Sequence, residues 1–194
     1  KAIVDIRQGT YYHTYRNTEK AFPYFLNAST WLNESKIEEI PLPGLHYQFI
    51  ANFYAYLDYR NESNNFFFKS LPFAKPNTRE KINMLTSIGL NYFNDKNYQK
   101  ATIYFNQAKQ DALSRKDSVW LGISNGYLSK IALINNNTNL ALRLLKTNVY
   151  YSKKYNESLD HMRSLLSLAK LYIIEKKWDL ALGSIQEAQT YFED

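Results

Sequence analysis

The sequence contains no cysteine. This absence excludes disulfide bonds, iron–sulfur clusters and zinc sites built on cysteine. The sequence also holds no run of 18 or more apolar residues, which is the length that a membrane-spanning helix needs. It shows no signal peptide and starts at Lys1 rather than at methionine, so we interpret it as a segment of a longer protein.

A strong excess of one charge sign is also missing. The sequence has 24 basic and 18 acidic residues, and its net charge is +6. Up to Asn97 there are 11 basic and 9 acidic residues, and from Tyr98 onward there are 13 and 9. An excess spread in this way is typical of solvated faces, whereas a nucleic-acid surface needs a basic patch. We therefore expect no direct nucleic-acid binding by this segment.

Chemistry-bearing motifs are scarce. The three histidines, His13, His46 and His161, share no spacing of helical metal ligands, so no metal and no cofactor are expected. The glycine-containing stretch "LGISNG" is not followed by the Lys-Ser/Thr of a phosphate loop. The stretch "SLAK" (167–170) matches a hydrolase nucleophile motif without its companion motifs, which favours a chance match. The sequence predicts no catalytic residue and no enzyme.

Aromatic residues are abundant, with 17 Tyr and 11 Phe, and some of them stand at fixed positions of a sequence repeat. Small residues recur about 40 positions apart, at Ala21, Ser63, Ala101, Ala141 and Ala181. Four residues after each comes a large apolar residue: Phe25, Phe67, Phe105, Leu145 and Ile185. Three further on comes a small residue in four copies (Ala28, Ser70, Ala108 and Ala188), while Asn148 stands in the fifth. Positions i, i+4 and i+7 lie on one face of a helix, so each copy predicts an amphipathic helix.

A second small residue lies twelve positions before each of these references, at Gly9, Ala51, Gly89, Ser129 and Ala169. Polar stretches such as "FNDKN", "INNNTN" and "EKKWD" separate the two segments and are typical of turns. Each copy is therefore predicted to be a pair of helices. The small residues allow the two helices to approach closely, and the large residue fills the layer between them.

The stretch "IGLNYFNDKNYQKATIYFNQA" (88–108) resembles the tetratricopeptide repeat (TPR), a helix–turn–helix unit of about 34 residues. The resemblance implies an all-α fold, a right-handed solenoid of about five antiparallel helix pairs with a period near 40. It implies a single TPR-like domain over residues 2–194, with approximate repeats 2–37, 44–76, 78–115, 118–155 and 158–194. Ser63 and Asn148 depart from the pattern, and an irregular helical bundle is the alternative.

Prolines predict interruptions of this pattern. Pro41 and Pro43 should end the preceding helix and hold an extended connection. Pro23 falls in the first turns of the second helix, so that helix is expected to begin late or to bend.

The resemblance also implies a non-catalytic module that binds a protein or peptide partner along the first helix of each pair. The matching positions of this sequence are Gln48, Asn52, Tyr56, Asn83, Thr86, Lys130, Arg163 and Lys170. Side-chain amides can pair with a peptide backbone, and tyrosine offers a rigid contact surface. Lysine can attract an acidic ligand. The alternative for each residue is an ordinary polar position on the surface.

A second function stays open beside the first. The Asn-, Lys- and Tyr-rich composition is similar to that of TPR regulators from Bacteroidetes-type bacteria. The segment would then be the sensory or dimerisation domain of a larger bacterial signalling protein or transcriptional regulator whose output domain lies elsewhere. The compartment, cytoplasmic or periplasmic, is left undecided.

The last helix carries more apolar residues than one partner helix can bury, among them Leu180, Leu182, Ile185, Tyr191 and Phe192. We expect an open apolar surface at this end, because a terminal repeat otherwise presents a polar face. Such a patch usually marks an interface. It could continue into a further segment beyond Asp194 or drive self-association.

Overall fold

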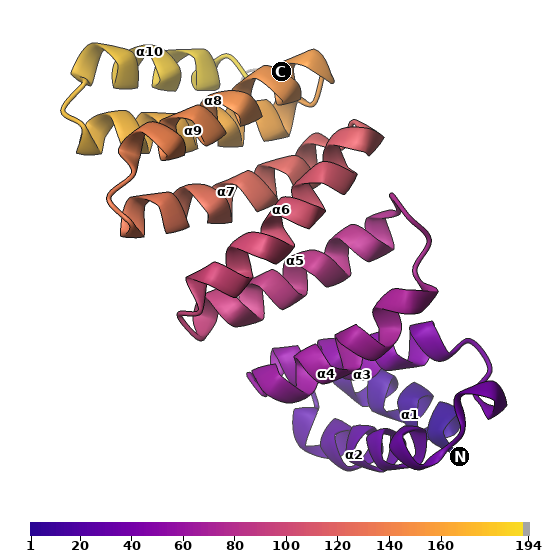
Figure 1. The fold of residues 1–194 in the computed structure, drawn as a ribbon. Helices are drawn as coiled ribbons and strands as arrows, with labels where there is room; N and C mark the ends of the chain where they lie inside the picture. The colour runs from indigo at the N-terminus through magenta and orange to yellow at the C-terminus, as the bar shows by residue number, and fades with distance from the viewer. Residues whose placement is uncertain (192–194) are drawn as a thin grey trace. The chain divides into compact units, whose positions relative to one another are not determined.

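The computed structural model describes residues 1–191 (Figure 1), and within this range it contains helices and no strand. The α-helices are α1 (Ala2–Thr14), α2 (Thr18–Glu34), α3 (Pro43–Tyr56), α4 (Arg60–Ser70), α5 (Arg79–Asn94), α6 (Tyr98–Arg115), α7 (Ser118–Ile134), α8 (Thr138–Lys154), α9 (Ser158–Ile174) and α10 (Trp178–Gln189). Two short 3-10 helices, η1 (Ile37–Glu39) and η2 (Leu71–Phe73), lie in the connections. The predicted all-α class is confirmed.

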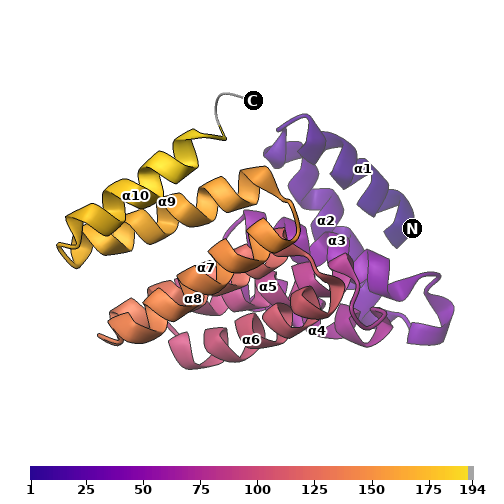
Figure 2. The ribbon, with the colours of Figure 1, turned by 90° about the horizontal axis from the view of Figure 1, so that it is seen from above.

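The chain divides into two compact units. The first comprises Lys1–Lys75 and Leu90–Asp95, and the second comprises Pro76–Gly89 and Lys96–Asp194. In the first unit α1 packs against α2 and α3 packs against α4. In the second unit α7 packs against α8, and α9 lies beside α10 (Figure 2). Consecutive helices thus form pairs, as the repeat predicts, while the extent of a single repeat domain stays a prediction.

The small residues of the repeat lie where helices cross. All five reference residues, from Ala21 to Ala181, are buried. A Cβ atom on Gly9 would lie 2.8 Å from the Phe25 ring, and one on Gly89 would lie 2.8 Å from the Phe105 ring. The large residue of each second helix in these two pairs therefore rests directly on the backbone of the first helix. This contact explains why a small residue stands twelve positions before the reference.

The two departures from the pattern are buried and hydrogen-bonded. Ser63 accepts a hydrogen bond from Asn91 Nδ2 at 2.9 Å within the first unit. Asn148 Oδ1 accepts a hydrogen bond from Asn125 Nδ2 at 2.7 Å within the second unit. A buried polar group without a partner costs about 1–3 kcal/mol, so these bonds make polar residues tolerable at apolar positions.

The turns between helices share one backbone conformation. A residue with positive φ stands directly before the N-cap residue in seven turns: Arg16, Asp58, Lys96, Lys116, Asn136, Asn156 and Lys176. In three of these turns an asparagine follows and its side chain accepts a hydrogen bond from the helix: Asn17, Asn97 and Asn137. Asparagine is a favoured N-cap because its oxygen satisfies a free backbone N–H.

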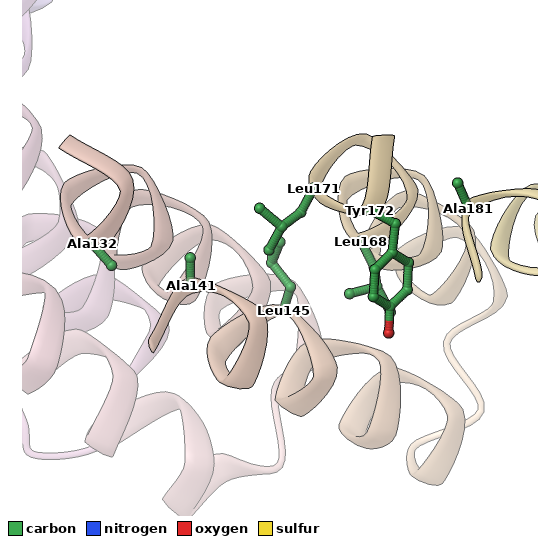
Figure 3. Close-up of a cluster of buried hydrophobic side chains, with 7 residues drawn as sticks. All are labelled: Ala132, Ala141, Leu145, Leu168, Leu171, Tyr172 and Ala181. Atoms are coloured by element: carbon green, nitrogen blue, oxygen red, sulfur yellow. The ribbon is translucent and has the colours of Figure 1, made fainter. Parts of the chain in front are cut away.

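The core of the second unit joins two helix pairs (Figure 3). Leu145 of α8 lies close to Leu168, Leu171 and Tyr172 of α9, and Ala132, Ala141 and Ala181 complete the cluster. Burying a leucine side chain contributes roughly 1.5–3 kcal/mol. Packing between neighbouring pairs therefore stabilises each pair, which could not bury its apolar face alone.

The prolines behave only partly as expected. Pro43 begins α3, after a connection that contains η1. Pro23 lies inside α2, which already begins at Thr18, so the expectation of a late start is wrong. The Asn17 cap fixes the first turn ahead of the proline. Among residues 1–191, no helix combines the length and the apolar character needed to cross a membrane.

Candidate binding groove

A groove runs between the first helices of two successive pairs in the second unit, α7 and α9. Gly122, Ile123 and Gly126 of α7 line one side, and Arg163 and Ser167 of α9 line the other. The groove has a volume of about 230 Å³. We call it the α7–α9 groove.

Two glycines keep the α7 side of this groove open. A Cβ atom added to Gly122 or Gly126 would meet no described atom within 4 Å, in contrast to the close contacts at Gly9 and Gly89. Internal packing therefore does not require glycine here. Glycine within a helix costs roughly 0.5–1 kcal/mol relative to alanine. Its presence twice, one turn apart, leaves helical backbone accessible to another molecule.

The charged groups of the groove come from α9. Asp160 accepts a hydrogen bond from Ser118 Oγ at 2.8 Å, and its second oxygen lies 3.7 Å from a guanidinium nitrogen of Arg163. The Arg163 side chain is 69% exposed. Its remaining N–H groups can donate to a carboxylate or to backbone carbonyl groups of a bound segment.

The floor of the groove is formed by α8. Leu145 supplies an apolar surface, and Asn148 is held by Asn125 while its own amide nitrogen lies 3.4 Å from the Gly122 carbonyl oxygen. The floor is thus partly apolar and partly polar, as a surface that orients a peptide must be.

The structure places three predicted binding residues of the second unit on α7 and α9, and all three are exposed: Lys130, Arg163 and Lys170. Arg163 lines the groove. Lys130 follows Gly126 by one turn, and its Nζ lies 4.6 Å from the centre of the Tyr127 ring. Lys170 follows Ser167 by about one turn. Residues three or four positions apart share a helix face, so both lysines extend the stripe that borders the groove.

The two predicted residues on α5 fit less well. Thr86 is 6% exposed, and its hydroxyl is buried without a hydrogen-bond partner among residues 1–191. Its side chain is therefore closed to solvent in this structure, and its role in binding stays a prediction. Its neighbours Met84 and Leu85 are also buried, so other residues cover this part of α5 on several sides. Asn83 is half-buried and lies 3.5 Å from the Ser87 hydroxyl.

In the first unit, α3 carries three predicted residues at intervals of four: Gln48 is half-buried, and Asn52 and Tyr56 are exposed. The Tyr56 ring meets the His13 ring of α1 edge-on, with centroids 4.5 Å apart. The structure thus joins the first helices of two pairs there. The binding role of Gln48, Asn52 and Tyr56 stays a prediction.

Sequence reasoning missed Gly122 and Gly126. The signal was present in "LGISNG", whose glycines are spaced by four, but the stretch was tested only as a phosphate loop. Helical glycines spaced by four share one face, but the spacing alone does not tell whether that face packs or stays open. Burial of Asp160 beside Ser118 depends on packing between helices 42 positions apart and had no sequence signal.

No group of three or more metal-ligating side chains that could hold a metal ion occurs in the described part of the chain. His161 is buried, and its Nδ1 lies 3.1 Å from Ser152 Oγ and its Nε2 3.3 Å from Glu187. The hydrogen bond with His161 is the largest influence that lowers the pKa of Glu187. This contact ties α8, α9 and α10 together and lies outside the groove.

Comparison with known proteins identifies the fold. No family model and no curated protein matches the sequence. Among solved structures, nearly identical TPR-like repeats from Podosopora anserina align with a TM-score of 0.76 and 14% identity, over 97% of this chain and 92% of that one. The apo form of RapI aligns with a TM-score of 0.77 and 13% identity, over 99% of this chain and 70% of that one. A Rap protein complexed with competence and sporulation factor aligns with a TM-score of 0.64 and 16% identity, over 96% of this chain and 53% of that one. At these identities the likeness concerns architecture, and the fold of this chain is that of the TPR-like repeat proteins.

Proposed function

We propose that this chain is a non-catalytic repeat module that binds an extended segment of a partner protein in the α7–α9 groove. One observation carries the proposal: Gly122 and Gly126 leave backbone open at a place where packing does not require glycine. Arg163 and Asp160 supply a donor and an acceptor at the opposite wall. A peptide backbone needs both kinds of group along its length.

Three further points support this reading. The groove lies between first helices, where the TPR resemblance places the ligand. The Rap protein of similar fold was solved in complex with competence and sporulation factor, so a related architecture does hold another molecule. The groove lining contains no histidine that could act as a base, which favours binding over hydrolysis.

Peptides selected from a random display library on the wild-type chain provide the test. Gly126→Phe should reduce their affinity about tenfold or more, because the ring fills the groove. The variant should still fold, because its Cβ meets open space. Gly183→Phe on α10 is the matched control, since a Cβ there also meets no described atom within 4 Å. Peptides that bind Gly126→Phe as tightly as the wild type would place the binding surface elsewhere.

A second candidate is the sensory or dimerisation domain of a larger signalling protein. The similarity to RapI and to the complexed Rap protein favours it. The complete reading frame decides between the two, since an output domain joined to this segment would support a regulator.

Self-association through the last helix is part of this second candidate. Trp178, Leu180 and Leu182 of α10 are 62%, 53% and 55% exposed. Phe192, which was expected to join them, lies outside the described residues. Exposed apolar side chains gathered on one helix are typical of an interface.

A further inference from the structure

Positive charge gathers in the segment that contains α6, α7 and α8. Residues 98–154 hold nine basic residues against two acidic ones: Lys100, Lys109, Arg115, Lys116, Lys130, Arg143, Lys146, Lys153 and Lys154, against Asp111 and Asp117. Nine minus two gives +7, which exceeds the +6 of the whole chain. The excess is therefore not spread along the sequence as expected, because counting by halves averaged this segment with acidic neighbours.

Within this segment, α6, α8 and the end of α7 line a pocket of about 520 Å³. Lys109 comes from α6 and Arg143 comes from α8. The apolar floor contains Leu128, Ile131 and Leu144. We call this site the Lys109–Arg143 pocket, and it shares no lining residue with the α7–α9 groove.

The two cations of this pocket lack a counter-charge. The lining contains neither Asp nor Glu, and no carboxylate of residues 1–191 forms an ion pair with Lys109 or Arg143. Asp111, the one acidic residue of α6, lies 3.4 Å from Lys81 instead. Two like charges that share a partly desolvated site repel one another, and a bound anion would relieve that repulsion.

The protonation of Lys109 reflects the same surroundings. Burial, and after it the charge of Arg143, lowers the pKa of the Lys109 ammonium group. Lysine is normally paired when it is buried. Here the half-buried ammonium shares the pocket with another cation, while the amides of Asn106 and Asn135 in the lining offer further donors.

We propose that the Lys109–Arg143 pocket binds the phosphate group of a phosphate monoester, with the organic part of the ligand resting on the apolar floor. Two cations match the charge of a dianion, which a phosphate monoester carries above its second pKa of about 6. Arginine offers a planar pair of donors and lysine a compact charge, and both are common ligands of phosphate. The ester can be a free small molecule or a phosphorylated side chain of a partner.

Titration calorimetry with phenyl phosphate tests this proposal on the 194-residue chain. The wild type should bind phenyl phosphate, and should bind phenol far more weakly. Lys109→Gln and Arg143→Gln should each weaken binding about tenfold or more, as the loss of a charge-assisted contact does. Affinity should also fall as the pH drops below about 6, because the ligand becomes a monoanion. If the affinity for phenyl phosphate did not change with the pH or with either substitution, the assignment of a phosphate site would be contradicted.

Lys36→Gln is the charge-matched control, because Lys36 is exposed and lies in the connection before η1. If Lys36→Gln weakens the binding of phenyl phosphate as much as Lys109→Gln does, the anion is attracted by the overall positive charge, and the pocket is not a specific binding site. Thermal unfolding gives a reading independent of the ligand: both pocket variants should unfold at a temperature no lower than the wild type, since each removes repulsion. A clear drop in that temperature would mean that the cations are paired in solution, and would overturn the proposal.

A phosphotyrosine peptide and its unphosphorylated form distinguish the two sources of the ester. Tighter binding of the phosphopeptide than of phenyl phosphate supports a phosphorylated partner, and equal binding supports a small molecule. Binding of both peptides alike would contradict recognition of phosphate. Gly126→Phe, which blocks the α7–α9 groove, should leave binding of phenyl phosphate intact, so failure of one proposal does not imply failure of the other.

Discussion

At the scale of single residues, glycine serves two opposite purposes in this chain. Gly9 and Gly89 allow a phenylalanine ring to rest on the backbone, whereas Gly122 and Gly126 face open space. The same residue type is therefore required for packing at one position and dispensable for packing at another. The residues that lie nearby in space decide whether glycine is required for packing, and these neighbours cannot be identified from the sequence alone.

Alanine substitutions should separate the two kinds of glycine. Gly126→Ala should raise the free energy of unfolding by roughly 0.5–1 kcal/mol, because alanine favours the helix and its Cβ meets no described atom within 4 Å. Gly89→Ala should lower it by about 1–3 kcal/mol through overpacking. The Phe105 ring cannot easily move away, since it is fully buried and stacks on Tyr127. Denaturant unfolding of both variants measures the difference, and equal effects would contradict the described packing.

His46 predicts a dependence of stability on pH. Burial is the largest influence on its pKa and lowers it below the ordinary value of 6.5, and the charge of Arg7 acts in the same direction. The unfolded chain therefore binds a proton more readily than the folded chain. Stability should be fully present above pH 6.5 and should fall as the pH drops through the lowered pKa.

Unfolding of the wild type and of His46→Gln from pH about 8 to about 5 measures this contribution. The wild type should lose more stability than the variant over that range. The comparison removes the contributions of the other titrating groups, because both chains share them. Parallel curves for the two chains would show that His46 is protonated equally in both states.

At the scale of elements, the structure confirms the helix pairs that the spacing of small residues predicted. The spacing succeeded because small residues at a helix crossing are a requirement of close packing, and that requirement appears in the sequence as a fixed interval. It could not predict the partners of Ser63 or Asn148, because the hydrogen bonds join residues 28 and 23 positions apart. The α7–α9 groove was missed for a related reason. It exists because no described side chain of another helix packs against Gly122 and Gly126, and the sequence does not show such an absence of contact.

The N-caps offer a prediction at the same scale. Asn137 accepts a hydrogen bond from the Leu140 backbone at 3.0 Å at the start of α8. Glu157 occupies the equivalent position before α9, and its side chain makes no capping bond. Asn137→Ala should therefore cost about 1 kcal/mol of stability, and Glu157→Ala should cost clearly less. Thermal unfolding of the two variants tests this order, and a larger loss in Glu157→Ala would refute it.

At the scale of the whole molecule, the fold is better determined than the function. The likeness to TPR-like repeats covers 97% of the chain at 14% identity, so it concerns the architecture alone. Positions where helices cross must hold small residues, and these residues appear in the sequence at a regular interval. Positions that bind a partner face solvent, and their identity depends on that partner. Of the eight predicted contact residues, Arg163 lines the α7–α9 groove.

The last helix provides the prediction for the whole molecule. If α10 mediates self-association, the 194-residue chain should form dimers or larger species as its concentration rises. The double change Trp178→Ser and Leu182→Ser should shift the equilibrium toward monomer, because it removes two exposed apolar side chains. Sedimentation equilibrium measures both chains, with Ile103→Ser on α6 as a control at another exposed apolar residue. A monomeric wild type at every concentration would rule out this interface.

The buried hydrogen bond between Asn125 and Asn148 affects which helices pair with one another during folding. A chain built from similar helix pairs can join a second helix to the wrong first helix, or exchange helices with another copy. Apolar contacts would tolerate many such errors. A mispaired α8 would instead bury the Asn148 amide against an apolar face, and an unsatisfied buried amide is costly. We therefore expect this polar pair to favour the packing of α8 on α7 over its packing on other, similar helices.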